Sequence, residues 1–94
     1  MPTLHIMNKS PEHPRFGNCL AAIGEQDSLL LTGNGVLALA CRQNARTLPT
    51  GTRVLLADAE ARGLGQESLA ERGILVDYAG FVELTAANTK IISW

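Results

Sequence analysis

The sequence predicts one α/β domain, residues 1–94, built on a mostly parallel five-stranded sheet with helices on both faces. Three observations support this prediction. Short apolar runs recur along the chain, stretches of helical length separate them, and the runs lack the alternation of a strand with one solvent-exposed face. Such runs are typical of strands that are buried on both faces. Strands that alternate with helices imply right-handed crossovers and a parallel sheet.

The five apolar runs are the expected strands. They occupy residues 4–7, 29–31, 54–56, 74–76 and 91–92. Residues 42–52 are polar and contain Pro49 and Gly51, so we expect a loop there. The chain shows no internal repeat and no low-complexity linker, which again favours a single domain.

The gaps between the runs carry helical signals. In the first gap, apolar side chains recur at the spacing of one helical face, at Phe16, Cys19, Leu20 and Ile23. The second gap repeats this pattern with Val36, Leu39 and Ala40.

Two aspartates mark the expected starts of the later helices. Asp58 is expected to cap a short third helix, which Gly63 would end in the left-handed conformation. Asp77 is expected to cap a fourth helix. The apolar side of that helix comprises Tyr78, Phe81, Val82 and Leu84.

The composition bears on partners and location. Charged residues make up 18% of the chain, below the usual value of about 25%. We interpret this low content of charged residues as a sign that other subunits cover part of the surface. The alternative is ordinary variation in a small Ala-rich protein. The net charge is −1 and only Arg42 and Arg46 approach a basic cluster, so no direct binding of nucleic acid is expected. No transmembrane run and no secretory signal are visible, which predicts a cytoplasmic protein that binds no membrane.

Residues 33–38, from Gly33 to Ala38, fit the G-x-G-x-x-G/A pattern of dinucleotide-binding turns. They follow an expected strand and open an expected helix, so backbone amides could face a pyrophosphate. The alternative is a tight Asn-Gly turn with positive φ. The chain supplies only about one mononucleotide-binding half and the pattern lies in the second strand–helix unit, so we favour the turn and predict no cofactor.

The remaining polar candidates have structural alternatives. Asp58 and Asp77 each follow a strand and could line one rim as an acid–base pair, although an Asp at a helix start is more often an N-cap. His5 lies in an expected strand, where a hydrogen-bonded core histidine is the commoner case, and His13 is a single imidazole. No metal-ligand spacing is present, so no metal site is predicted.

The chain has two cysteines, Cys19 and Cys41, and neither belongs to a Cys-x-x-Cys pattern. Both are expected to be reduced thiols. A persulfide carrier needs an exposed thiolate with a lowered pKa. Cys19 lies between Phe16 and Ile23 on the apolar helical face, and Cys41 lies near a helix end, so a structural role is favoured for both.

A set of short motifs, in this order and spacing, resembles the TusB/DsrH family, the smallest subunit type of the sulfurtransferase complexes TusBCD and DsrEFH. The motifs are Leu4-His5, Asn8-Lys9-Ser10-Pro11, Asn34-Gly35-Val36, Asp58 with Ala61-Arg62-Gly63-Leu64, Val76-Asp77-Tyr78-Ala79-Gly80-Phe81-Val82, Leu84-Thr85 and the final Trp94. The resemblance spans nearly the whole chain.

The resemblance implies a DsrE-type fold and a role as a mainly structural subunit. Family members form a heterohexamer with TusC/DsrF-like and TusD/DsrE-like subunits, which takes sulfur from small carrier proteins. The destination is 2-thiouridine at the tRNA wobble position in the Tus branch, which we favour, and dissimilatory sulfur oxidation in the Dsr branch. The main acceptor cysteine lies on the TusD/DsrE-like partner, so no catalytic activity is expected of this chain alone.

The resemblance also bears on Cys19. Asn18-Cys19-Leu20 matches the place of a cysteine in the first helix of DsrH-type chains, which some TusB-type chains lack. Cys19 is therefore the candidate secondary sulfur carrier, and no catalytic, cofactor or metal residue is assigned. The rival hypothesis is a small nucleotide-binding or redox domain that uses the turn from Gly33 to Ala38.

Overall fold

The computed structural model describes residues 2–40, 48–49, 51–64 and 74–94. Its sheet has five strands in the order β4-β3-β2-β1-β5. They are β1 (Thr3–Met7), β2 (Ser28–Leu31), β3 (Arg53–Leu55), β4 (Leu75–Val76) and β5 (Lys90–Ser93). All four pairs of neighbouring strands are parallel, which confirms the predicted α/β fold.

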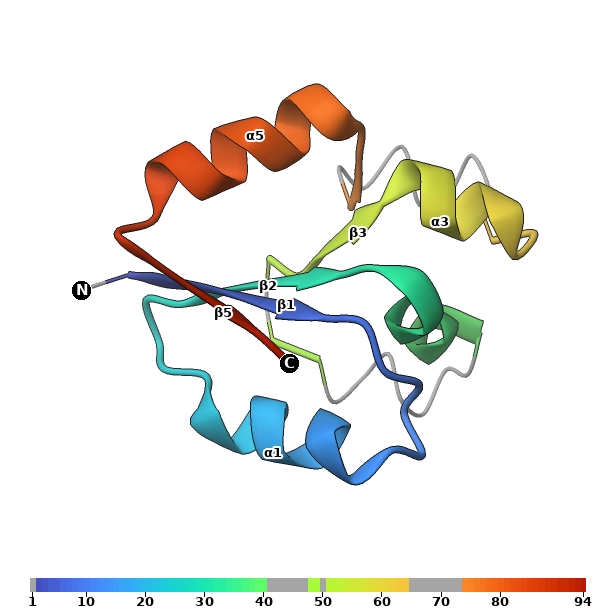
Figure 1. Cartoon of the computed structure of the whole chain (residues 1–94), viewed down its shortest axis with the longest axis horizontal. Helices are drawn as coiled ribbons and strands as arrows, with labels where there is room; N and C mark the ends of the chain where they lie inside the picture. The colour runs from blue at the N-terminus through green and yellow to red at the C-terminus, as the bar shows by residue number, and fades with distance from the viewer. Residues whose placement is uncertain (1, 41–47, 50, 65–73) are drawn as a thin grey trace.

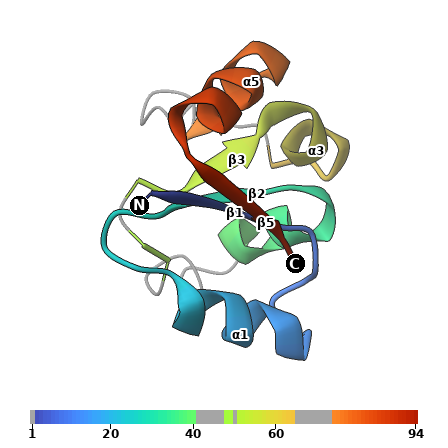
Figure 2. The same cartoon turned by 60° about the vertical axis from the view of Figure 1, so that its left-hand side comes forward.

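Helices cover both faces of the sheet. The α-helices are α1 (Pro14–Ala22), α3 (Leu56–Ala61) and α5 (Tyr78–Ala87), and η1 (Gly33–Ala40) is a 3₁₀ helix. Figures 1 and 2 both show α1 and α5 on opposite sides of the sheet. Within the described part of the chain, no helix is long and apolar enough to cross a membrane.

The main core lies between the sheet and α1. Side chains of β1, β2 and β3 meet side chains of α1, η1 and α3 there, in a cluster of Met7, Phe16, Cys19, Leu29, Leu31, Val36, Ala38, Val54 and Ala59. Because successive strand residues point to opposite faces, the alternate residues Leu4, Leu30 and Leu55 face the side of α5. All three are buried, although α5 itself has no buried residue.

The helix ends test the predicted caps. Asp77 caps α5 as expected, because its side chain accepts a hydrogen bond from the Gly80 amide at 2.8 Å. Gly63 follows the end of α3 with φ of 71°, also as expected. The prediction for Asp58 was wrong: the N-cap of α3 is Leu55, and Asp58 lies inside the first turn. The reason is that β3 continues directly into α3, so the cap position falls on the last strand residue.

The second predicted helix forms as a 3₁₀ helix rather than an α-helix. Val36 and Ala38 are its buried apolar residues together with Gly35. The predicted loop at residues 42–52 lies mostly outside the described residues. Its described part contains a turn in which the Thr52 amide donates to the Pro49 carbonyl at 3.2 Å.

Candidate functional site

Cys19 points from α1 into the main core, where its side chain is 1% exposed. Burial raises the pKa of its thiol to about 11. The residue lies in the middle of α1, away from the helix N-terminus that would favour a thiolate. At neutral pH, Cys19 is therefore a protonated, enclosed thiol, and a sulfur-carrying role stays a prediction. Cys41 lies outside the described residues.

The turn that fits the dinucleotide pattern uses its amides internally. Gly33 has φ of 50°, and its amide donates to Asp58 Oδ2 at 2.8 Å. The Gly35 amide donates to the Thr32 carbonyl at 2.8 Å. The carboxylate of Asp58 thus occupies the position at which a phosphate would accept from the Gly33 amide. The geometry agrees with the expected tight turn in that the backbone has a positive φ, but the positive φ is at Gly33, and Asn34 and Gly35 continue into the 3₁₀ helix η1.

Gly35 brings η1 against the end of β1. A Cβ atom at this position would lie 2.3 Å from the carbonyl oxygen of Met7. The Met7 carbonyl also accepts from the Thr32 amide at 3.0 Å, which joins β1 to the end of β2. The close approach therefore serves packing between the sheet and η1, and it requires a residue without a side chain.

Arg62, which follows α3, joins this helix to the turn at Gly33 by hydrogen bonds. Its guanidinium donates to Asn34 Oδ1 at 3.0 Å and to the Asp58 carbonyl at 3.1 Å. In the sequence, Asp58 and Arg62 belong to one motif and Asn34 to another, and no pattern joined the two motifs. Their contact depends on β2 and β3 being neighbours, which no local pattern reveals.

Asp58 and Asp77, the two aspartates considered as an acid–base pair, each bind a different backbone amide. Asp58 accepts from the Gly33 amide and Asp77 accepts from the Gly80 amide, each at 2.8 Å. Among the described residues, no group of His, Cys, Asp and Glu is arranged to hold a metal ion.

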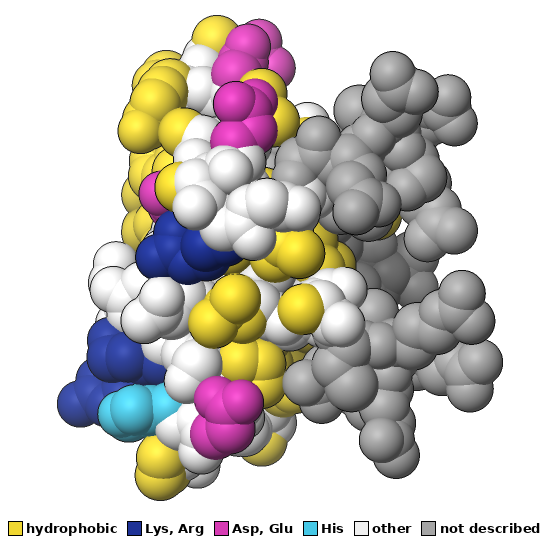
Figure 3. All heavy atoms as spheres, turned by 90° about the vertical axis from the view of Figure 1, so that its right-hand side faces the viewer, with side chains coloured by type: hydrophobic (Ala, Val, Ile, Leu, Met, Phe, Trp, Pro, Cys, Tyr) yellow, Lys and Arg dark blue, Asp and Glu magenta, His cyan; other side chains and the backbone are white. Residues whose placement is uncertain are grey.

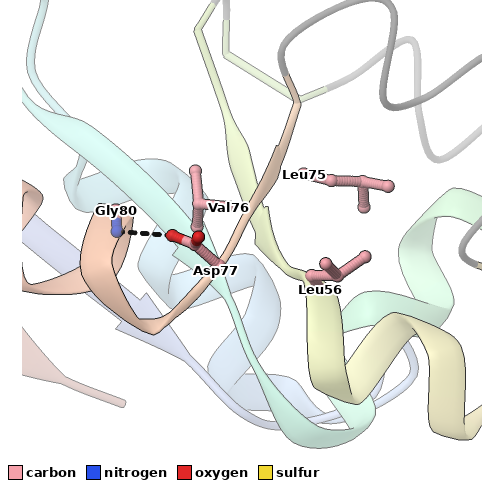
Figure 4. A pocket seen from close by; sticks show the side chains of 5 residues that line it. All are labelled: Leu56, Leu75, Val76, Asp77 and Gly80. Carbon is pink, nitrogen blue, oxygen red and sulfur yellow. Dashed lines mark hydrogen bonds between the residues drawn. The ribbon is translucent and has the colours of Figure 1, made fainter.

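A pocket of about 380 Å³ lies where β4 ends and α5 begins. Figure 4 shows its lining, which is apolar except for one carboxylate, and consists of Leu56, Leu75, Val76, Asp77 and Gly80. The carboxyl ends of strands in a parallel sheet are the usual place for a ligand. The lining offers an apolar wall and one negative charge, which suits a group with an aliphatic stem and a cationic end.

His5 is buried, at 2% exposure, with both ring nitrogens engaged. Trp94 Nε1 donates to His5 Nδ1 at 3.1 Å, and His5 Nε2 lies 3.0 Å from Asp27 Oδ2. An indole nitrogen can only donate, so Nδ1 is the acceptor and Nε2 carries the proton. No ring nitrogen is left for a metal or a substrate, and His5 is a hydrogen-bonded core histidine.

Asp27 anchors this network, which we call the Trp94 clamp and define as His5, Asp27 and Trp94. Hydrogen bonds lower the pKa of Asp27 to about 2, first from the Gly24 amide, then from His5 and the Thr3 amide. Sequence reasoning missed Asp27. A usable signal was its position directly before β2, whose Leu29 is paired in register with His5.

Trp94 is held by its backbone as well as by its ring. Its amide donates to the Ile6 carbonyl at 2.9 Å, and Lys9 Nζ donates to its carbonyl at 2.8 Å. The indole stacks on the His5 ring with the ring centres 6.0 Å apart. The clamp therefore fixes β5 against β1 at the edge of the sheet.

The side of the molecule at which the strands end carries charges of both signs. Figure 3 shows acidic and hydrophobic side chains in its upper part, and Lys, Arg and His side chains in its middle and lower left. His13 is the N-cap of α1 and accepts from the Arg15 amide at 3.1 Å. Over the residues drawn in colour, this face lacks the continuous basic surface that phosphate binding requires.

The comparison with known proteins decides the family. A family model described as "DsrH like protein" matches residues 9–91. The chain belongs to the TusB/DsrH family. Within this family, Protein TusB of Pectobacterium parmentieri and Protein TusB of Escherichia coli K12 are each 33% identical over 95 residues, covering 97% of this chain and 99% of the relative. Protein TusB of Pectobacterium atrosepticum is 30% identical over the same coverage.

The TusB/DsrH family assignment confirms the resemblance found in the sequence motifs. The matched range, residues 9–91, contains the residues that form the turn at Gly33, the hydrogen bonds of Asp58 and Arg62, and the pocket at Asp77. His5 and Trp94 lie just outside the matched range. The alignment with Protein TusB of Pectobacterium parmentieri covers 97% of the chain.

Proposed function

We propose that this chain is a mainly structural subunit of a cytoplasmic sulfur-relay complex that forms 2-thiouridine at the wobble position of tRNA. The complex is a heterohexamer with TusC/DsrF-like and TusD/DsrE-like subunits, and small carrier proteins deliver its sulfur. One observation carries the proposal: relatives that align over nearly the whole length, at 33% identity, are TusB proteins.

The geometry of the described residues supports a structural rather than a catalytic role. Cys19 is enclosed and its pKa is about 11, so it lacks the thiolate that sulfur transfer needs. The amides at Gly33 and Gly35 have internal acceptors, which disfavours the rival nucleotide-binding hypothesis. A chain with these properties contributes by binding its partners, and the acceptor cysteine belongs to the TusD/DsrE-like subunit.

A second candidate is the corresponding subunit of a sulfur-oxidation complex. The matching family model bears the name DsrH, and Cys19 stands at the place of the cysteine of DsrH-type chains. The two candidates share fold and assembly. They differ in whether the sulfur reaches tRNA.

The deciding experiment uses the source cells. The gene is deleted, and 2-thiouridine at the wobble position is measured in bulk tRNA by mass spectrometry. The tRNA-thiolation role predicts loss of this nucleoside and its recovery when the wild-type gene is restored. Unchanged 2-thiouridine together with impaired sulfur oxidation would favour the second candidate. Native purification of the chain, with identification of every co-purifying protein, tests the heterohexamer.

A further inference from the structure

The two faces of the sheet are covered unequally. On the α1 face, Phe16 and Cys19 of the helix are buried in the main core. On the opposite face, α5 has no buried residue at all, and its Tyr78 and Val82 are 67% and 63% exposed. Figures 1 and 2 show α5 on the side of the sheet opposite α1, with α3 on the same side as α5.

The composition of α5 does not suit a helix left in water. Its sequence, Tyr-Ala-Gly-Phe-Val-Glu-Leu-Thr-Ala-Ala, contains one charged residue, Glu83. A helix that is apolar on all sides is normally buried. Most of the exposed large hydrophobic residues in the described part of the chain belong to α5 or to the edge strand β5, namely Tyr78, Val82 and Ile91.

Ile91 extends the same apolar surface from α5 onto the sheet. It is paired in register with Leu4, and paired residues of neighbouring strands share a face. Leu4 lies on the side of α5, so Ile91 lies there too, on a strand that forms the edge of the sheet. We call the exposed residues Tyr78, Val82 and Ile91 the α5 surface.

The pocket adjoins the first turn of α5. Two of its lining residues, Asp77 and Gly80, flank Tyr78 in the chain. Figure 4 shows the Asp77 carboxylate at this pocket with one of its oxygens bonded to the Gly80 amide. The other oxygen, Oδ2, has no hydrogen bond from any described residue. As far as the described part of the chain is concerned, this oxygen can accept from a cationic group brought by another molecule.

We infer that the α5 surface and the adjoining pocket form the docking site of a partner subunit that presents an apolar face to α5 and one Lys or Arg side chain to Asp77. This inference rests on the proposed function, because it assigns a place to a partner of the relay complex. The aliphatic stem of a Lys or Arg would lie along Leu75 and Val76, and its charge would pair with the carboxylate.

Charge complementarity favours a different subunit over a second copy of this chain. Among the described residues, Asp77 at the pocket and Glu83 of α5 are exposed acidic groups, and α5 itself has no Lys or Arg. Lys90 is paired with Thr3 and so lies on the opposite face. Arg53 is paired with Leu30 and so lies on the side of α5, at the first residue of β3, where its guanidinium donates to the Gly51 carbonyl. A second copy would therefore bring acidic groups to the site and no free base from α5.

The test compares variants of the tagged chain purified natively from its own cells, with partner chains measured by quantitative mass spectrometry. Val82→Glu places a charge at the centre of the α5 surface. Asp77→Asn removes the negative charge and keeps an N-cap for α5, because Asn caps about as well as Asp. Ala21→Glu, on the exposed side of α1, is the matched control.

We expect the wild type and Ala21→Glu to retain the partner subunits equally. Val82→Glu should reduce them at least tenfold, and Asp77→Asn several-fold, with melting temperatures of the purified chains close to that of the wild type. If Val82→Glu fails to fold, Tyr78→Glu on the same surface serves in its place, since Tyr78 is 67% exposed.

The outcomes separate the inference from the proposed function. Partner subunits that stay bound to Val82→Glu and Tyr78→Glu would overturn the docking site and leave the proposed function standing. A wild-type chain that carries no related subunit would overturn both. A homodimer in light scattering that Val82→Glu dissociates, with partner subunits retained, would show that a second copy occupies the surface and would overturn the stated occupant.

Discussion

Cys19 and Asp27 show how the surroundings of a single side chain set its chemistry. The Cys19 thiol lies among apolar neighbours that disfavour its charged form, so its pKa rises. The Asp27 carboxylate receives hydrogen bonds that favour its charged form, so its pKa falls. The first group is thereby kept unreactive at neutral pH, and the second is kept ionised as the acceptor of the Trp94 clamp.

The substitution Cys19→Ser is expected to leave the assembly intact and wobble thiolation nearly unchanged. A buried hydroxyl without a partner costs roughly 1–3 kcal/mol. In α1, however, the serine can donate to the carbonyl of Arg15 four residues earlier, which places the loss near the low end. The measurements are 2-thiouridine in cells carrying the variant and the melting temperature of the purified complex. Lost thiolation with an unshifted melting temperature would make Cys19 a sulfur carrier.

The pKa of Asp27 predicts a defined dependence of stability on pH. Its folded value of about 2 lies below the value of roughly 3.9 expected in the unfolded chain. The stabilisation by the carboxylate is therefore fully present above about pH 4 and is lost as the pH falls through the folded pKa of about 2. We expect Asp27→Asn to lower the melting temperature at neutral pH, and the difference from the wild type to shrink over this acidic range.

The control for this measurement is Glu25→Gln. Glu25 is exposed in the same turn before β2, and no hydrogen bond from a described residue reaches its side chain. Its substitution should leave the melting temperature within about 1 °C of the wild type at every pH. A constant difference between Asp27→Asn and the wild type from neutral pH down to about pH 2 would contradict the assigned role of the carboxylate.

At the scale of elements, the apolar runs located all five strands. Burial on both faces explains the apolar run of the central strand β2. It does not explain β5, an edge strand whose residues are mostly exposed. The first and last helices also formed where the side-chain spacing and the Asp77 cap indicated. Asp58 is not a cap because β3 runs directly into α3 and the cap position falls on Leu55. The carboxylate of Asp58 instead accepts from the Gly33 amide, 25 residues away, a contact that no local pattern reveals. The Trp94 clamp could not be predicted for the same reason: its contacts join both ends of the chain and depend on strand order.

Gly35 is the element-scale position most sensitive to substitution. In Gly35→Ala, the new Cβ atom would meet the Met7 carbonyl at 2.3 Å, so β1 or η1 must move. Overpacking of this kind typically costs about 1–3 kcal/mol. Gly17→Ala is the matched control, because nothing lies within 4 Å of its Cβ and alanine favours the helix α1. Thermal unfolding should show a loss for Gly35→Ala and no loss for Gly17→Ala; equal stability of the two variants would refute the close approach.

At the scale of the whole molecule, the chain is expected to lack multiple-turnover sulfur transfer when it is purified without partners. The cysteine that the structure describes is enclosed, and no described base lies beside it to activate it. The assay follows sulfur from a persulfide donor to a thiol acceptor over many equivalents of protein. Turnover by the isolated chain would refute the structural role. The complex from the same cells supplies the positive control.

Nucleotide binding is the second whole-molecule test. A ligand at one hundred times its dissociation constant stabilises the folded state by about 2.7 kcal/mol. For a domain of this size, that would raise the melting temperature by more than 10 °C, since about 1 kcal/mol corresponds to 4–8 °C. Because the amides of the Gly33 turn have internal acceptors, we expect no shift with millimolar ATP, NAD or FMN. A clear shift with any of them would restore the nucleotide-binding hypothesis.

Trp94 is the sole tryptophan of the chain, and its indole contacts His5 across 89 positions of sequence. Its intrinsic fluorescence therefore reports on one event, the pairing of β5 with β1, and no added label is needed. An imidazole stacked on the indole alters the emission of the closed state, and water contact shifts the emission of the open state to longer wavelength. A stopped-flow trace at this wavelength would time the formation of the contact that joins the beginning of the chain to its end.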